Sequence, residues 1–120
     1  MNHPGSIVIR DLFRADRSPV PEVAWQPFRP GIEIHRLYGD GTTGPSAALL
    51  RYAPGASLPL HTHIGYEHIL VLRGSQVDAG GEYSAGTLLI NPPGTSHAVN
   101  SPQGCIVYIS WEKPVAFATG

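Results

Sequence analysis

Cysteine is almost absent from this sequence, in which Cys105 is the single example. One cysteine cannot form a disulfide within the chain, and this fits a reducing compartment. The neighbouring residues, Gly104 on one side and the apolar run 106–109 on the other, place Cys105 in a predicted apolar strand. Free cysteines in such surroundings are usually buried. We therefore expect an inert, buried thiol.

Charged residues are also scarce, at 14% of the chain against about 25% in an average soluble protein. The formal net charge is -1, and no cluster of basic residues occurs. These features argue against nucleic acid or an anionic membrane surface as a partner. No apolar run is long enough for a signal peptide or for the roughly 20 residues that span a bilayer. We predict a soluble, cytoplasmic protein that does not bind a membrane.

The length of 120 residues is sufficient for one domain with a real core and too short for two. We predict a single domain over 1–120. Its first part, about 1–30, is interpreted as an N-terminal arm, and about 31–112 as the barrel core.

Glycine and proline are frequent, with 14 and 12 residues, and they separate short apolar runs. This pattern predicts many turns and many short strands. Prolines within 23–31 exclude a helix interior or a central strand there. Gly74 is expected to end the strand that contains it. The predicted strands are 6–10, 32–38, 47–52, 57–63, 66–73, 76–78, 82–83, 87–91, 96–100 and 105–112. With loops at 11–21 and 39–45 and no convincing amphipathic helix, they predict an all-β antiparallel barrel or sandwich.

Two stretches concentrate metal-binding side chains: 55–74, GASLPLHTHIGYEHILVLRG, and 86–97, GTLLINPPGTSH. His61 and His63 are two residues apart, so on a strand both point to one face. Glu67 reaches the same point after the bend at 64–66, and its charge offsets part of a cation's. His97 supplies a fourth ligand if the rigid turn at 92–94 carries it back over the first stretch. An isolated histidine pair is more often a surface or core feature, but four candidates in two stretches favour one divalent metal ion.

The other histidines are predicted to stay outside the site. His68 follows Glu67 directly, so on a regular strand it points to the opposite, outer face. His3 and His35 lie far from both stretches and are expected to be solvated. The face of Glu67 also carries Ile69, which predicts that this face is interior, where an unpaired carboxylate would be costly.

These residues resemble the two motifs of the cupin family. The first motif, G-x5-H-x-H-x3-E-x6-G, is matched at every fixed position by Gly55, His61, His63, Glu67 and Gly74. The second, G-x5-P-x-G-x2-H, is matched by Gly86, Pro92, Gly94 and His97. The usual closing asparagine of the second motif is replaced by Ser101. The resemblance implies a small double-stranded β-helix (jelly-roll) barrel that holds one divalent metal ion and forms a homodimer.

Within the cupins, the chain is most similar to the cupin-like domain of ChrR-type anti-sigma factors. The likeness is closest in E-x-x-L-V-L-x-G at 67–74, Y-x-A-G-T at 83–87 and N-P-P-G-x-S-H-A at 91–98. Those regulators also carry a separate helical, zinc-binding domain that grips the sigma factor. This chain has neither the room nor the cysteines for it, so we expect a cupin domain standing alone, without sigma-factor inhibition. Related stand-alone cupins include dioxygenases that cleave carbon–carbon bonds in diketones and hydroxyketones.

Three neutral imidazoles and one carboxylate suit zinc as a closed tetrahedron. Iron, manganese or nickel accept the same ligands with positions left open. We expect zinc, with the other three metals as alternatives, and no preference for copper(I) or an iron–sulfur cluster because the ligand set has no thiolate. Residues on neighbouring strands could form a substrate pocket, although each could equally belong to the core or the surface. They are Arg51, Tyr52, Tyr66 and Trp111.

The predicted function is that of a metal-binding cupin-domain protein that binds a small molecule or an oxidant at the divalent metal. The alternative is a metal-dependent dioxygenase, in which a small diketone or hydroxyketone chelates through two oxygens and is activated to react with dioxygen. A third interpretation is a barrel with a purely structural metal. No motif for another reaction is present, and catalytic residues stay unassigned.

Overall fold

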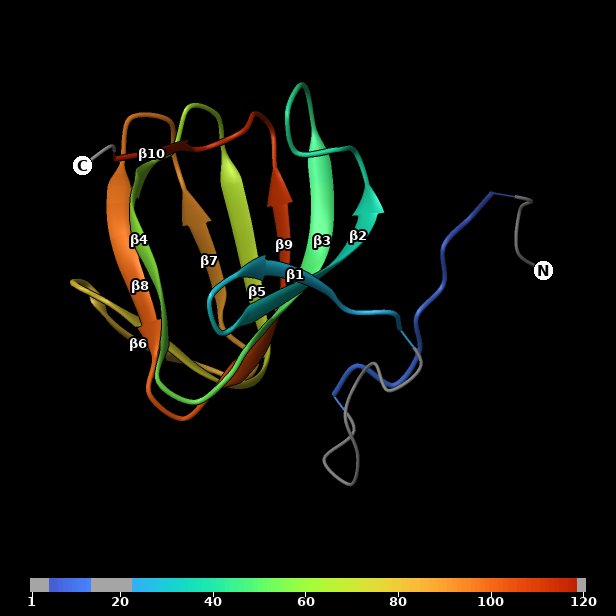
Figure 1. The fold of residues 1–120 in the computed structure, drawn as a ribbon, viewed down its shortest axis with the longest axis horizontal. Helices are drawn as coiled ribbons and strands as arrows, with labels where there is room; N and C mark the ends of the chain where they lie inside the picture. Colours follow the sequence, from blue (N-terminus) through green and yellow to red (C-terminus); the bar gives the residue numbers. More distant parts are fainter. Residues whose placement is uncertain (1–4, 14–22, 119–120) are drawn as a thin grey trace.

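Ten strands and no helix make up the described residues, 5–13 and 23–118, of this computed structural model. The strands are β1 Gln26–Arg29, β2 Ile32–Tyr38, β3 Ser46–Tyr52, β4 Ala56–Thr62, β5 Glu67–Asp78, β6 Gly81–Ser84, β7 Leu88–Asn91, β8 Ser96–Ser101, β9 Cys105–Trp111 and β10 Ala116–Phe117. Their hydrogen-bonded order is β1-β2-β3-β9-β5-β8-β4-β10, and β6 and β7 also pair with β5. Figure 1 shows this antiparallel sheet curled on itself, with β4 and β8 across from β3 and β9. The predicted all-β fold is confirmed.

The long strand β5 connects the two sides of the barrel. Its first residues, 67–70, pair with β7 and β9, whereas its last residues, 75–78, pair with β6. Between these parts the register against β9 shifts between Val71 and Arg73, and Gly74 has a φ of 73°. Glycine adopts this conformation without strain. The prediction that Gly74 ends the strand is wrong, because the irregularity is absorbed within the strand, which continues to Asp78.

The core lies inside the barrel and is built from alternating positions of the strands. In β5, Glu67, Ile69 and Val71 are buried, whereas His68 between them is exposed, as the alternation predicted. Cys105 is also buried, as predicted, and burial raises the pKa of its thiol to about 11. The buried interior cluster comprises Ile32, Ile34, Ala48, Leu50, Tyr52, Leu58, Ile69, Val71, Val99, Cys105, Val107 and Ile109.

The N-terminal residues differ from the sequence prediction. Residues 6–10 form no strand, and Figure 1 shows them running outside the barrel. Their β-branched side chains favour an extended backbone, but no strand within 23–118 pairs with them. Instead, Ile9 packs against a small outer cluster that contains Leu49 and Leu72. Most of the predicted loop 11–21, like His3, lies outside the described residues.

Two short strands complete the barrel. β1 carries Pro27 at the end of the sheet, where the missing proline N–H costs least, so the exclusion of a central strand is confirmed. The two-residue β10 was not predicted, and it pairs Phe117 with His61 of β4. No helix in the described part of the chain is long and apolar enough to cross a membrane.

Candidate metal centre

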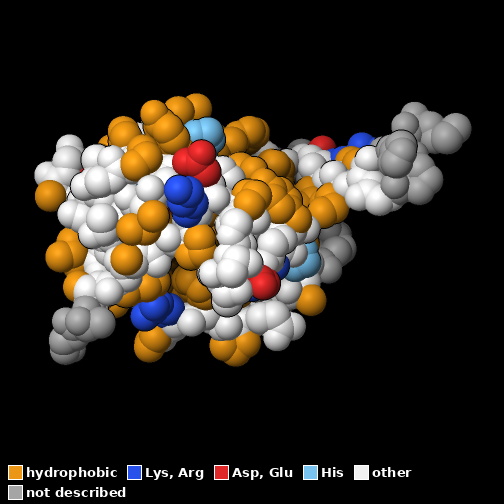
Figure 2. Space-filling view, turned by 90° about the horizontal axis from the view of Figure 1, so that it is seen from above, with side chains coloured by type: hydrophobic (Ala, Val, Ile, Leu, Met, Phe, Trp, Pro, Cys, Tyr) orange, Lys and Arg blue, Asp and Glu red, His pale blue; other side chains and the backbone are white. Residues whose placement is uncertain are grey.

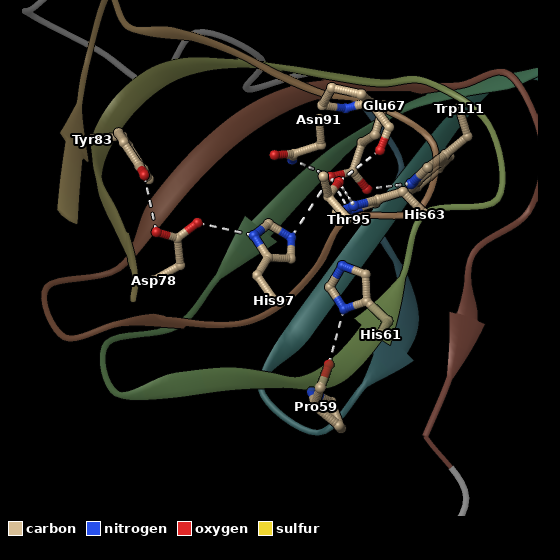
Figure 3. A network of polar contacts seen from close by, with 11 residues as sticks. Pro59, His61, His63, Glu67, Asp78, Tyr83, Asn91, Thr95, His97 and Trp111 are labelled. Carbon is tan, nitrogen blue, oxygen red and sulfur yellow. Dashed lines mark hydrogen bonds and ion pairs between the residues drawn. The ribbon is translucent and has the colours of Figure 1, made fainter. Parts of the chain in front are cut away.

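Four side chains from three separate segments converge inside the barrel (Figure 3). His61 lies at the end of β4, opposite His97 of β8 in the antiparallel register, and His63 follows directly after β4. The bend at 64–66 then brings Glu67 to the start of β5. One ligand atom from each of the four residues lies within 4.8 Å of the others, and all four side chains are at most 9% exposed.

The turn that carries His97 is fixed to the first histidine segment by the backbone. The N–H of His63 donates to the carbonyl of Thr95 at 2.8 Å, and the N–H of Gly94 donates to the carbonyl of His63 at 2.8 Å. Gly94 has a φ of 89°, which the turn requires and which favours glycine. The sequence therefore places the two histidine segments side by side through local turn chemistry, as the proline-rich turn predicted.

Each histidine ring is oriented by an acceptor at Nδ1. His61 Nδ1 lies 2.9 Å from the carbonyl oxygen of Pro59, and His97 Nδ1 lies 2.9 Å from Asp78 Oδ2. His63 Nδ1 lies 2.9 Å from the hydroxyl of Thr95, which itself donates to the carbonyl of Pro92 at 2.6 Å and must therefore accept from the ring. All three rings consequently carry their proton on Nδ1. The Nε2 lone pairs remain free to bind a cation.

The free nitrogens show that a cation fits this site. His63 Nε2 and His97 Nε2 are buried and make no hydrogen bond. They nevertheless lie 2.9 and 3.7 Å from Glu67 Oε1. Lone pairs facing a buried carboxylate repel it unless a positive charge lies between them. Three imidazole nitrogens and a carboxylate around one point are a donor set for a divalent metal ion.

Glu67 is held in place by two further donors. Asn91 Nδ2 donates to Oε1 at 3.0 Å, and Trp111 Nε1 donates to Oε2 at 2.8 Å. Burial raises the pKa of Glu67, but a proton on the facing His63 Nε2 and the hydrogen bond from Asn91 outweigh burial, so the pKa lies below its ordinary value. A metal ion bound by His63 in place of that proton would supply the same positive charge. Burial lowers the pKa of His61, with the Pro59 carbonyl acting in the opposite direction. An ionised carboxylate and a neutral imidazole are the forms that bind metals.

Several supporting residues were missed by the sequence analysis. Asp78 fixes His97 and also accepts from the Tyr83 hydroxyl at 2.9 Å (Figure 3). Asn91 and Thr95 lie just before and just after the Pro92–Gly94 turn of the second motif. The general requirement that a metal-binding histidine donates its second nitrogen to an acceptor could have directed attention to polar residues near the motifs. It could not have singled out Asp78, which lies 19 residues from His97 in the sequence.

Of the four proposed pocket residues, two lie at the site or in the interior of the barrel and two lie outside it. Trp111 reaches the site through Glu67, and Tyr52 lies in the interior cluster. The structure does not bring Arg51 to the site, because its guanidinium binds Glu33 at 2.6 Å and lies over the Trp25 ring. Tyr66 is 49% exposed and lines a surface depression that also contains His68. Its backbone binds Glu112 twice: the N–H of Tyr66 donates to Glu112 Oε1 at 3.0 Å, and its carbonyl accepts from the Glu112 N–H at 2.9 Å.

Two cavities lie beside the four-residue cluster: the first is lined by His97 itself, and the second by residues that contact the cluster. One of about 570 Å³ borders β6, β7 and β8 and is lined by Asp78, Asn91 and His97 among others. The other, of about 290 Å³, is lined in part by Trp111 and Phe117. The Phe117 ring centre is 5.4 Å from that of His61. A small molecule entering either cavity would contact a residue that touches the cluster.

Comparison with known proteins identifies the architecture. The sequence profile of the ChrR cupin-like domain matches residues 17–115. A cupin-like protein of unknown function from Ralstonia eutropha is 28% identical with a TM-score of 0.68, covering 74% of this chain and 59% of that one. A chain from the Rhodobacter sphaeroides complex of SigE with the anti-sigma ChrR is 26% identical with a TM-score of 0.69, covering 77% and 51%. The chain thus spans less than two thirds of either protein.

An acetylacetone dioxygenase from Acinetobacter johnsonii is 20% identical with a TM-score of 0.72, covering 79% of this chain and 72% of that one. At this identity the likeness concerns the fold alone. Among curated proteins no match was found. The predicted double-stranded β-helix barrel of the cupin type is confirmed by these structural likenesses.

Removing the Asp78 carboxylate should weaken metal binding while leaving the barrel folded. Asp78→Ala deletes the acceptor that fixes the His97 ring. Loss of such an outer partner usually lowers metal affinity about 10- to 100-fold. Competition with a chromophoric chelator measures this affinity, and circular dichroism verifies the fold.

Tyr83→Phe is the matched control, because it removes only the hydroxyl that donates to Asp78 and keeps the contact with His97. We expect its affinity to stay close to that of the wild type. An unchanged affinity in Asp78→Ala would show that Asp78 does not position His97.

Proposed function

From the premise that this chain belongs to the family of ChrR cupin-like domains, we propose that it binds one divalent metal ion and presents it to a small molecule or an oxidant. His61, His63, Glu67 and His97 are the proposed ligands. The observation that carries the proposal is the set of Nδ1 contacts, which leaves three Nε2 atoms directed at a buried carboxylate. We propose zinc as the metal, with iron, manganese and nickel as alternatives.

The residues around the cluster would prepare it for such a ligand. Trp111 and Asn91 hold one carboxylate oxygen each, so Glu67 keeps its orientation when a ligand enters. The apolar interior excludes bulk water and strengthens electrostatic interactions at the centre. A bound metal would supply a Lewis-acid centre for an oxygen atom of the ligand.

The alternative proposal is a dioxygenase that acts on a small diketone. It is supported by the fold shared with the acetylacetone dioxygenase and by a donor set that iron, manganese or nickel accept with open positions. The reaction would consume one dioxygen per diketone, break one carbon–carbon bond and place one oxygen atom in each product. The electrons come from the diketone itself, so no other reductant is needed.

One experiment separates these proposals. Protein reconstituted anaerobically with zinc or with iron(II) is titrated with acetylacetone while its melting temperature is followed, and oxygen uptake is then recorded with an electrode. A metal-binding module predicts a ligand-dependent rise in melting temperature without catalytic oxygen uptake. Many turnovers of oxygen uptake with iron would instead establish the dioxygenase. Neither a melting shift nor uptake in metal-loaded protein would favour a purely structural metal and contradict both.

A further inference from the structure

We propose that the 290 Å³ cavity at the barrel end selects small molecules that carry a carboxylate, which Arg29 and Arg36 bind while other oxygen atoms of the molecule face the metal. This proposal rests on the proposed function, because it names the chemical class of the ligand. The residues of the cavity that the argument uses are Phe28, Arg29, Arg36, Ser46, Trp111 and Phe117.

The cavity is joined to the metal centre through two aromatic side chains. Trp111 donates to Glu67 Oε2 at 2.8 Å, and the Phe117 ring lies 5.4 Å from the His61 ring, centre to centre. The same Phe117 ring contacts Arg29, whose Cζ is 3.6 Å from the ring centre. The Phe117 ring therefore lies next to both the candidate metal ligand His61 and the guanidinium group of Arg29.

The second guanidinium group of the cavity belongs to Arg36, on the inner face of β2. Ile32 and Ile34 are buried in the core, and Arg36 continues the same face at the open end of the barrel. Its guanidinium lies against the β2–β3 turn, where a Cβ on Gly41 would be 2.7 Å from Arg36 Nη1. Figure 2 views the molecule from above and shows a hollow with hydrophobic walls and a basic side chain at its rim.

Neither cavity arginine forms an ion pair with a carboxylate in the described part of the chain. The nearby Asp40 accepts instead from the backbone N–H groups of Thr42 and Thr43, at 2.8 and 3.3 Å. Arg51 differs from both of them, because its charge is neutralised by an ion pair with Glu33 on the outer face. Two uncompensated guanidinium groups beside one cavity form a binding site for an anion.

The chemistry of the cavity limits what this anion can be. Guanidinium groups match the planar geometry of a carboxylate and bind it through paired hydrogen bonds. The remaining walls are largely apolar and include the rings of Phe28, Trp111 and Phe117, which suits a short hydrocarbon chain between the carboxylate and the oxygens at the metal. The volume of about 290 Å³ admits a small organic acid.

A matched pair of diketones tests the proposal. The probes are 4,6-dioxoheptanoate, which carries a carboxylate beside a chelating diketone, and its uncharged methyl ester. Isothermal titration of zinc-loaded wild-type protein should show the acid binding about 10- to 100-fold more tightly than the ester, as expected for charge-assisted hydrogen bonds. The double variant Arg29→Gln/Arg36→Gln should remove this preference, and Arg51→Gln should retain it.

Metal content separates failure of this proposal from failure of the proposed function. If zinc binds at one ion per chain but acid and ester bind equally, the carboxylate site is refuted and the metal site stands. A preference that persists in the double variant would mean that the carboxylate binds the metal itself, which also refutes the arginine site. If the wild type binds no zinc, the proposed function is refuted, and the carboxylate proposal that rests on it is refuted as well. One zinc per chain in the double variant verifies that its barrel is intact.

Discussion

His63→Ala is expected to reduce bound metal from one ion per chain to a small fraction of that. The side chain is 1% exposed, its Nδ1 is fixed by Thr95, and its Nε2 lies 2.9 Å from Glu67 Oε1. A four-ligand zinc site contributes about 10–16 kcal/mol of binding free energy. Loss of one ligand should therefore weaken binding on the order of 100- to 1,000-fold. Elemental analysis after gel filtration measures the loss.

His68→Ala is the matched control for this variant. His68 neighbours Glu67 but lies exposed on the opposite face of β5. Its replacement should leave metal binding unchanged. Full metal occupancy in His63→Ala, or equal losses in both variants, would refute the assignment of His63 as a ligand.

Metal removal should have the largest effect on stability. In the metal-free barrel, two buried imidazole nitrogens without a hydrogen bond, Nε2 of His63 and of His97, lie 2.9 and 3.7 Å from the buried Glu67 Oε1. A metal that binds only the folded state stabilises it by about 4 kcal/mol at a free concentration 1,000 times its Kd. For a chain of this size, that corresponds to a rise in Tm of about 12–20 °C. Differential scanning calorimetry of metal-free and reloaded protein measures the difference.

The same experiment on His63→Ala shows where the stabilisation arises. At the same metal concentration this variant should gain only about 1–7 °C, because a Kd weakened 100- to 1,000-fold leaves about 0.4–1.4 kcal/mol of stabilisation. A similar rise in both proteins would mean that the metal acts elsewhere on the surface. No rise in the wild type would contradict a metal site inside the barrel.

Local patterns were sufficient to predict most strands and the four candidate ligands. Alternation in β2 and β5 distinguished inner from outer residues, and the spacing of His61 and His63 placed both rings on one face. Alternation could not have excluded Arg51, because β3 is buried at every position except Arg51; its place on the outer face follows from its pairing with Glu33 of β2. Alternation could have excluded Tyr66, which immediately precedes the buried Glu67.

Other features depend on tertiary contacts that no local pattern encodes. Asp78 reaches His97 only because β5 continues past Gly74 and crosses to the side of β6 and β8. Arg29 lies in the first described strand of the sequence and Phe117 in the last, yet the two side chains meet at the same cavity. The segment 6–10 has the composition of a strand but pairs with none of the ten strands that the structure describes. Its extended path was predictable, whereas its lack of hydrogen-bonded neighbours was not.

The central claim is that His61, His63, Glu67 and His97 hold one metal ion, and the most direct measurement is metal content per chain. Protein purified without added metal or chelator, together with a sample stripped and reloaded with zinc or iron(II), should be assayed by elemental analysis. Close to one divalent ion per chain is expected in the reloaded protein. Reloaded protein that is folded but retains no stoichiometric metal would contradict it.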